Sequence, residues 1–77
     1  MSTVTLRYFA SLRETVGRSS QQIDLQGEES AAAVFRRATG LALPAEILVA
    51  VNQTYAAAEK QIREGDEVAF FPPVTGG

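Results

Sequence analysis

The chain has 77 residues, of which 45% are hydrophobic and 21% are charged, so it is long enough for one small globular domain. Seven Lys and Arg against nine Asp and Glu leave a net charge of −2, which argues against a nucleic-acid-binding protein because such proteins carry a basic surface. The sequence contains neither Cys nor His, which excludes thiolate nucleophiles, disulfides, the usual zinc sites and Ser-His-Asp triads.

The cellular location of the protein is predicted from two signals that the sequence lacks. No apolar run approaches the roughly 18 residues that a membrane-spanning helix needs. The first residues also lack the positively charged segment that opens a signal peptide. We therefore expect a cytoplasmic protein that has neither a membrane nor a nucleic acid as its partner.

The chain opens with the pattern of a strand, a short helix and a second strand. Residues 3–9 alternate between apolar and polar side chains, and Phe9 falls on the more polar face. A Ser-x-x-Glu capping box then predicts a short helix that is capped by Ser11 and stops at Gly17. Residues 21–25 predict the second strand.

The main helix is predicted between Ser30, a suitable N-cap, and Gly40, the expected residue just past the last turn. Four apolar residues at helical spacing form one stripe: Ala31, Val34, Phe35 and Ala38. This stripe should pack across a sheet, with Arg36 and Arg37 facing water.

The next strands are predicted around a tight turn. Residues 47–51 form a near-continuous apolar run, which predicts a central strand that is buried, or nearly buried, on both sides. Asn52 and Gln53 should form the turn, because Asn tolerates a left-handed backbone. Residues 54–57 return as a short strand that carries Tyr55.

The final strand follows a turn over residues 63–66 and spans residues 67–71, with Phe71 on the exposed side. Glu64, Asp66 and Glu67 lack the spacing of a calcium loop, so a solvated turn is the better interpretation and no metal site is expected.

The chain ends in Phe-Phe-Pro-Pro-Val-Thr-Gly-Gly over residues 70–77. Pro72 and Pro73 cannot donate backbone hydrogen bonds, so they should end sheet pairing and push the chain outward. The six residues from there to the end span about 20 Å when extended. Gly76 and Gly77 have no side chains that could pack on the domain, but they can pass through a narrow channel. Gly77 then presents a free α-carboxylate. A frayed terminus is the alternative.

This ending, together with Val-Asn-Gln-Thr at residues 51–54 and Gly-Asp-Glu-Val-Ala at residues 65–69, closely resembles the small, sulfur-carrying subunits of molybdopterin synthase. These subunits are ubiquitin-like β-grasp proteins. The resemblance implies an α+β fold, with a mixed sheet of about five strands packed on one main helix and the first and last strands parallel at its centre. It also implies a β-grasp domain over residues 1–71 and a protruding tail over residues 72–77.

The resemblance implies a carrier rather than a catalyst. Gly77 would be adenylated and then converted to 1-thioglycine, a thiocarboxylate whose sulfur forms the molybdopterin dithiolene in molybdenum cofactor biosynthesis. Gly76 would provide clearance. The chain would bind no cofactor itself, because ATP is used by the activating partner and AMP is linked only transiently to Gly77.

Three kinds of protein partner are implied. They are the large subunit of molybdopterin synthase, a ubiquitin-activating-type adenylyltransferase, and a sulfurtransferase or desulfurase as sulfur donor. With the large subunit, the chain would form a heterotetramer that contains two copies of each subunit. The resemblance places Phe9 and Phe71 close together on the outer face of the sheet.

The expected partner contacts are Phe9, Tyr55, Phe71, Pro72, Pro73, Val74 and Thr75, with Arg13 at the rim. Tyr55 has a simpler interpretation, in which its ring merely covers a sheet edge.

Three alternatives stay open. A sulfur carrier for thiamine or cysteine synthesis would use the same tail chemistry. A ubiquitin-like protein modifier would be joined through Gly77 to lysines of other proteins. A purely structural β-grasp module would not depend on Gly77 at all.

Overall fold

The computed structural model describes residues 2–73, which form an α+β fold of seven strands and two helices within that range. The strands are β1 (Thr3–Tyr8), β2 (Ser20–Asp24), β3 (Glu29–Ser30), β4 (Leu48–Val51), β5 (Thr54–Ala56), β6 (Gln61–Ile62) and β7 (Glu67–Phe71). The helices are α1 (Ser11–Val16) and α2 (Ala31–Thr39). Five strands form one sheet in the order β2-β1-β7-β4-β5, while β3 pairs only with β6.

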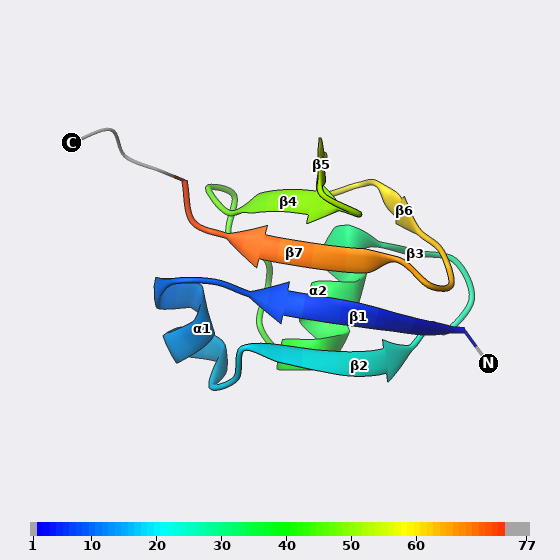
Figure 1. Cartoon of the computed structure of the whole chain (residues 1–77), viewed down its shortest axis with the longest axis horizontal. Helices are drawn as coiled ribbons and strands as arrows, with labels where there is room; N and C mark the ends of the chain where they lie inside the picture. Colours follow the sequence, from blue (N-terminus) through cyan, green and yellow to red (C-terminus); the bar gives the residue numbers. More distant parts are fainter. Residues whose placement is uncertain (1, 74–77) are drawn as a thin grey trace.

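The first and last strands lie side by side at the centre of the sheet and run parallel, as the resemblance implied (Figure 1). Thr5 lies opposite Glu67, and Tyr8 lies opposite Phe70. The other pairings of this sheet are antiparallel, so the sheet is mixed. Because β1 and β7 point the same way, both end at the same edge of the sheet.

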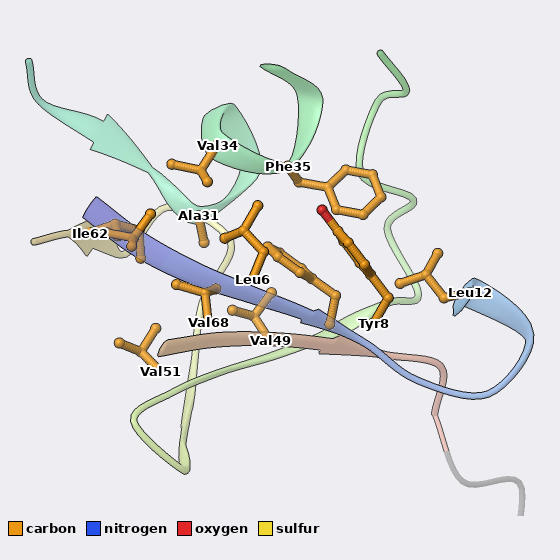
Figure 2. Close-up of a cluster of buried hydrophobic side chains, with 12 residues drawn as sticks. Leu6, Tyr8, Leu12, Ala31, Val34, Phe35, Val49, Val51, Ile62 and Val68 are labelled. Atoms are coloured by element: carbon orange, nitrogen blue, oxygen red, sulfur yellow. The ribbon is translucent and has the colours of Figure 1, made fainter. Parts of the chain in front are cut away.

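Helix α2 covers one face of the sheet, and the core lies between them (Figure 2). Phe35 reaches from α2 to the β7 side chain Phe70, with ring centroids 4.9 Å apart. Tyr8 of β1 stacks on the same Phe70 ring at 5.9 Å. Each of these side chains is at most 1% exposed, and burying one contributes about 1.5 to 3 kcal/mol. The predicted apolar stripe of α2 therefore faces the sheet.

Both predicted ends of α2 are confirmed. The Ser30 hydroxyl accepts a hydrogen bond from the Ala33 amide at 3.1 Å, which caps the first turn. Gly40 adopts φ 77°, and its amide donates to the Arg36 carbonyl at 2.8 Å. Arg37 does not simply face water, as its pattern predicted, because its guanidinium pairs with Glu29 at 2.8 Å.

The capping box predicted for α1 is wrong, although Gly17 does end the helix with φ 93°. Ser11 is the first helical residue rather than the N-cap, and no side chain caps this helix. Ala10 precedes the helix with φ 55° and ψ −135°. The chain must reverse sharply after β1, so Ala10 takes the cap position in an unusual backbone conformation.

Strand β4 is buried on one side and half-buried on the other, which is less than the near-complete burial predicted from its apolar run. Val49 and Val51 are buried, whereas Leu48 and Ala50 are half-buried. The reason is that neither helix within residues 2–73 covers the second face of the sheet (Figure 1). The Asn52-Gln53 turn is confirmed, with φ values of 51° and 69°.

Strand β6 lies in a stretch that gave no strand signal. It is only two residues long and depends on its partner β3.

Candidate functional site

The uncovered face of the sheet carries the candidate site. It is the face turned toward the viewer in Figure 1, with α2 behind the strands. Register brings outward-pointing residues of four strands into one row across it. These residues are Arg7 of β1, Ala69 of β7, Ala50 of β4 and Tyr55 of β5.

Three predicted contacts, Phe9, Tyr55 and Phe71, meet on this face and are called the aromatic cluster below. The Phe71 ring is central, with its centroid 6.4 Å from that of Phe9 and 5.8 Å from that of Tyr55. Phe9 is 42% exposed and Tyr55 is 73% exposed. Phe71 is half-buried rather than exposed, since it lies between the other two rings.

The strand pairing explains why these rings meet. The Phe9 amide donates to the Phe70 carbonyl at 3.1 Å, which extends the parallel pairing of β1 and β7 by one residue. Phe71 lies opposite Leu48 of β4, and Tyr55 lies opposite Ala50 of the same strand. The cluster therefore joins residues that are far apart in the sequence.

Arg7 adjoins the aromatic cluster and was missed from the sequence. Its guanidinium lies 5.6 Å from the centroid of the Phe9 ring, a distance that allows a cation–π contact. It also lies 3.5 Å from the Glu67 carboxylate on the neighbouring strand. The signal was available, because Arg7 is two residues before Phe9 and so shares its face of the strand.

The turn that precedes β7 is held by side-chain hydrogen bonds. Asp66 accepts from the Asn52 side-chain amide at 2.9 Å and from the Arg63 backbone amide at 2.8 Å. Asn52 in turn accepts from the Glu67 amide at 3.0 Å. Asp66 thus organises the turn and ties it to the β4–β5 hairpin that carries Tyr55.

The tail leaves the sheet beside the aromatic cluster. Pro72 is half-buried and Pro73 is exposed, and they follow β7 directly (Figure 1). The predicted site residues Val74, Thr75, Gly76 and Gly77 lie outside the described residues. Arg13 is exposed on α1, and its backbone hydrogen bonds within residues 2–73 are to Ala10 and Gly17, not to the aromatic cluster.

Three residues with shifted pKa values lie outside the aromatic cluster. Burial raises the pKa of Tyr8 to about 12, and its hydroxyl donates to the Gln21 side chain at 3.1 Å. The hydrogen bond from Arg37 lowers the pKa of Glu29, and the same bond raises the pKa of Arg37. These groups stabilise the fold and do not face the site.

Residues 2–73 contain no group of three or more His, Cys, Asp or Glu side chains that could hold a metal ion. Neither helix in that range is long and apolar enough to cross a membrane.

Similarity to known proteins covers nearly the whole chain. The sequence model of the ThiS family matches residues 6–77. A protein of Escherichia coli named molybdopterin synthase sulfur carrier subunit is 37% identical, over 96% of this chain and 99% of its own length. A Haemophilus influenzae protein of the same name is 38% identical, over 91% and 94% of the two chains.

The fold is also similar to solved structures of ubiquitin-like β-grasp proteins. The crystal structure of small archaeal modifier protein 1 from Haloferax volcanii superposes with a TM-score of 0.77 at 27% identity. It covers 97% of this chain and 99% of its own. The expected ubiquitin-like β-grasp fold is therefore confirmed.

Proposed function

The chain belongs to the ThiS family, and from this membership we propose that it is the sulfur carrier subunit of a molybdopterin synthase, with Gly77 as the sulfur-bearing residue. The observation that carries the proposal is the near-complete match to the two bacterial sulfur carrier subunits. The family match runs through Gly77, so it includes the Phe-Phe-Pro-Pro-Val-Thr-Gly-Gly ending.

The proposed chemistry takes place at the Gly77 carboxylate. One carboxylate oxygen attacks the α-phosphorus of an ATP molecule held by the activating partner, and pyrophosphate leaves. The terminal sulfur of a donor persulfide then attacks the acyl carbon, and AMP leaves. A thiol finally attacks the donor's own sulfur, which breaks the sulfur–sulfur bond and leaves the thiocarboxylate on Gly77.

The catalysts of these steps would belong to the partners. This chain has no Cys to carry a persulfide and no His to act as a base near neutral pH. Its own contribution is to present the acid end at the right distance from a docking surface. We assign docking to the aromatic cluster, reach to Pro72, Pro73, Val74 and Thr75, and clearance to Gly76.

The proposal names three partners: the molybdopterin synthase large subunit, an adenylyltransferase of the ubiquitin-activating type, and a sulfurtransferase or desulfurase. The exposed rings of Phe9 and Tyr55 favour docking of the first two on the same face. Burying such anchors contributes about 1.5 to 3 kcal/mol each, enough to hold a partner while the tail reaches its active site.

Intact-mass spectrometry after incubation with ATP, an activating enzyme and a persulfide donor tests the chemistry. We expect one oxygen-to-sulfur exchange, located at Gly77 by fragmentation. A variant with one alanine added after Gly77 keeps the fold and the docking face but moves the acid end, and it should not support production of the dithiolene. Exchange at another residue, or full activity of the extended variant, would contradict the proposal.

A protein modifier is the second candidate, and the similarity to small archaeal modifier protein 1 is the observation that favours it. The same activated Gly77 would then form an isopeptide bond with a lysine of another protein. Lysine-linked conjugates in cell extract would favour this function. Co-purification with a molybdopterin synthase large subunit, in the absence of such conjugates, would favour the sulfur carrier.

A further inference from the structure

Ala10 has the most unusual backbone of the described residues. Its φ of 55° and ψ of −135° lie close to the first central position of a type II′ turn, at about +60° and −120°, where glycine is preferred. The Leu12 amide donates to the Phe9 carbonyl at 3.2 Å, which closes this turn between β1 and α1. The turn thus begins at a residue of the aromatic cluster.

An alanine in this conformation destabilises the free protein. The β-carbon of an L-residue crowds the backbone at positive φ, whereas glycine adopts the same angles without strain. Packing does not compensate, because Ala10 is exposed. The other two non-glycine residues with positive φ in the described range, Asn52 and Gln53, form the hairpin turn. Burial within residues 2–73 therefore gives no reason for a β-carbon at position 10.

We propose that the methyl group of Ala10 contacts the large subunit when this chain docks, which makes Ala10 a specificity-determining residue of the interface. This inference rests on the proposed function and adds a residue to it. Ala10 directly follows Phe9, whose ring packs on Phe71 and whose amide donates to the Phe70 carbonyl, so Ala10 lies next to the end of β7. A partner that covers the aromatic cluster and the end of β7 would therefore come close to this exposed residue.

The substitution Ala10→Gly tests the inference because its two effects should have opposite signs. Relief of strain should raise the melting temperature by about 4 to 8 °C. Loss of the methyl contact should weaken binding of the large subunit about fourfold, as expected for one buried carbon. Calorimetric titration and thermal unfolding of the full chain measure the two effects.

Two control variants separate the methyl group from the backbone. Ala10→Ser keeps a β-carbon at the same place, so it should bind about as tightly as the unsubstituted chain. Gln53→Gly relieves a positive φ at another turn, so it should raise the melting temperature without weakening binding. A loss of affinity in Gln53→Gly would mean that the added backbone freedom of a glycine is enough to weaken binding. That result would overturn the inference.

A double substitution distinguishes direct contact from an effect on the neighbouring ring. If Ala10 touches the partner, Ala10→Gly should weaken binding by the same factor in the Phe9→Ala background. If the effect disappears there, Ala10 acts only through Phe9, and the contact is disproved. Equal affinity of Ala10→Gly and the unsubstituted chain also disproves it. Failure of the unsubstituted chain to bind at all would instead overturn the proposed function, and the contact with it.

Discussion

Tyr55 illustrates how a single side chain can matter for binding and little for folding. Its side chain is 73% exposed, and its contact within the aromatic cluster is with the Phe71 ring at 5.8 Å. An exposed aromatic residue buries little of its area in the free protein, and removing it changes stability only slightly. If a partner covers the ring, the same residue becomes an anchor.

We predict that Tyr55→Ala lowers affinity for the large subunit about tenfold or more, because the ring is buried only in the complex. The free energy of unfolding should change by no more than about 0.5 kcal/mol. Titration calorimetry and urea denaturation measure the two quantities. Leu41→Ala is the matched control, since Leu41 is 42% exposed and lies outside the aromatic cluster. It should leave affinity unchanged.

The opposite pattern would support the simpler interpretation of Tyr55. If the ring only covers the sheet edge, Tyr55→Ala should destabilise the protein and leave affinity as it was. The two interpretations therefore differ in both measurements.

The elements on the helix side of the sheet are tied together by Arg37 of α2. Its guanidinium donates two hydrogen bonds to the Glu29 carboxylate of β3, at 2.8 and 2.9 Å, and one to the Asp24 carbonyl of β2 at 2.6 Å. The Glu29 side chain is only 11% exposed in this pair. Such a two-pronged, partly buried ion pair is stronger than an ordinary surface pair.

This pair predicts a pH dependence of stability. The hydrogen bond from Arg37 lowers the pKa of Glu29 below its ordinary value of 4.5. The stabilisation is therefore fully present above the unfolded-state pKa, and it is lost as the pH falls through the lower folded-state pKa. Glu29→Gln should reduce the free energy of unfolding by about 1 kcal/mol at neutral pH, and by less at about pH 3.

Urea denaturation at both pH values checks this expectation. Glu28→Gln is the control, because Glu28 is an exposed neighbour of the same charge and should matter little at either pH. If Glu29→Gln destabilises the protein more at the lower pH than at neutral pH, the predicted direction of the pH dependence is wrong.

Local patterns predicted some elements well and others poorly. Ser30 and Gly40 at the ends of α2 were identified correctly, because capping depends on side chains and backbone angles within one turn. The cap of α1 was misplaced, because the position of Ala10 depends on where β1 must end. Strand β6 was missed, since it forms only where β3 offers a partner.

At the scale of the whole molecule, the proposed function assigns more than one partner to the same face of the sheet. The tail leaves the sheet at the edge where β1 and β7 end, directly beside the aromatic cluster (Figure 1). We propose that an enzyme that takes the tail into its active site also contacts that cluster. The proposed activating enzyme and the proposed large subunit would compete for the same rings.

We predict that the two partners bind this chain one at a time. In size-exclusion chromatography, adding the large subunit should release the chain from the activating enzyme, and no complex of all three should elute. As a control, Tyr55→Ala should weaken both complexes. A stable ternary complex would contradict the shared docking surface.

Residue types and their spacing were enough to predict the apolar stripe of α2 and the shared outward face of Phe9 and Arg7 at the end of β1, whereas the tail over residues 72–77 stays a prediction. These features depend on chain connectivity and on periods of two or 3.6 residues. The contacts between those residues depend on which strands pair, and Thr5 and Glu67 are distant in the sequence. The parallel pairing of β1 with β7 brings Phe9 against Phe71 and Arg7 near Glu67. Local patterns contain no information about such long-range contacts. The resemblance placed Phe9 beside Phe71, but the full aromatic cluster is defined only by the folded chain.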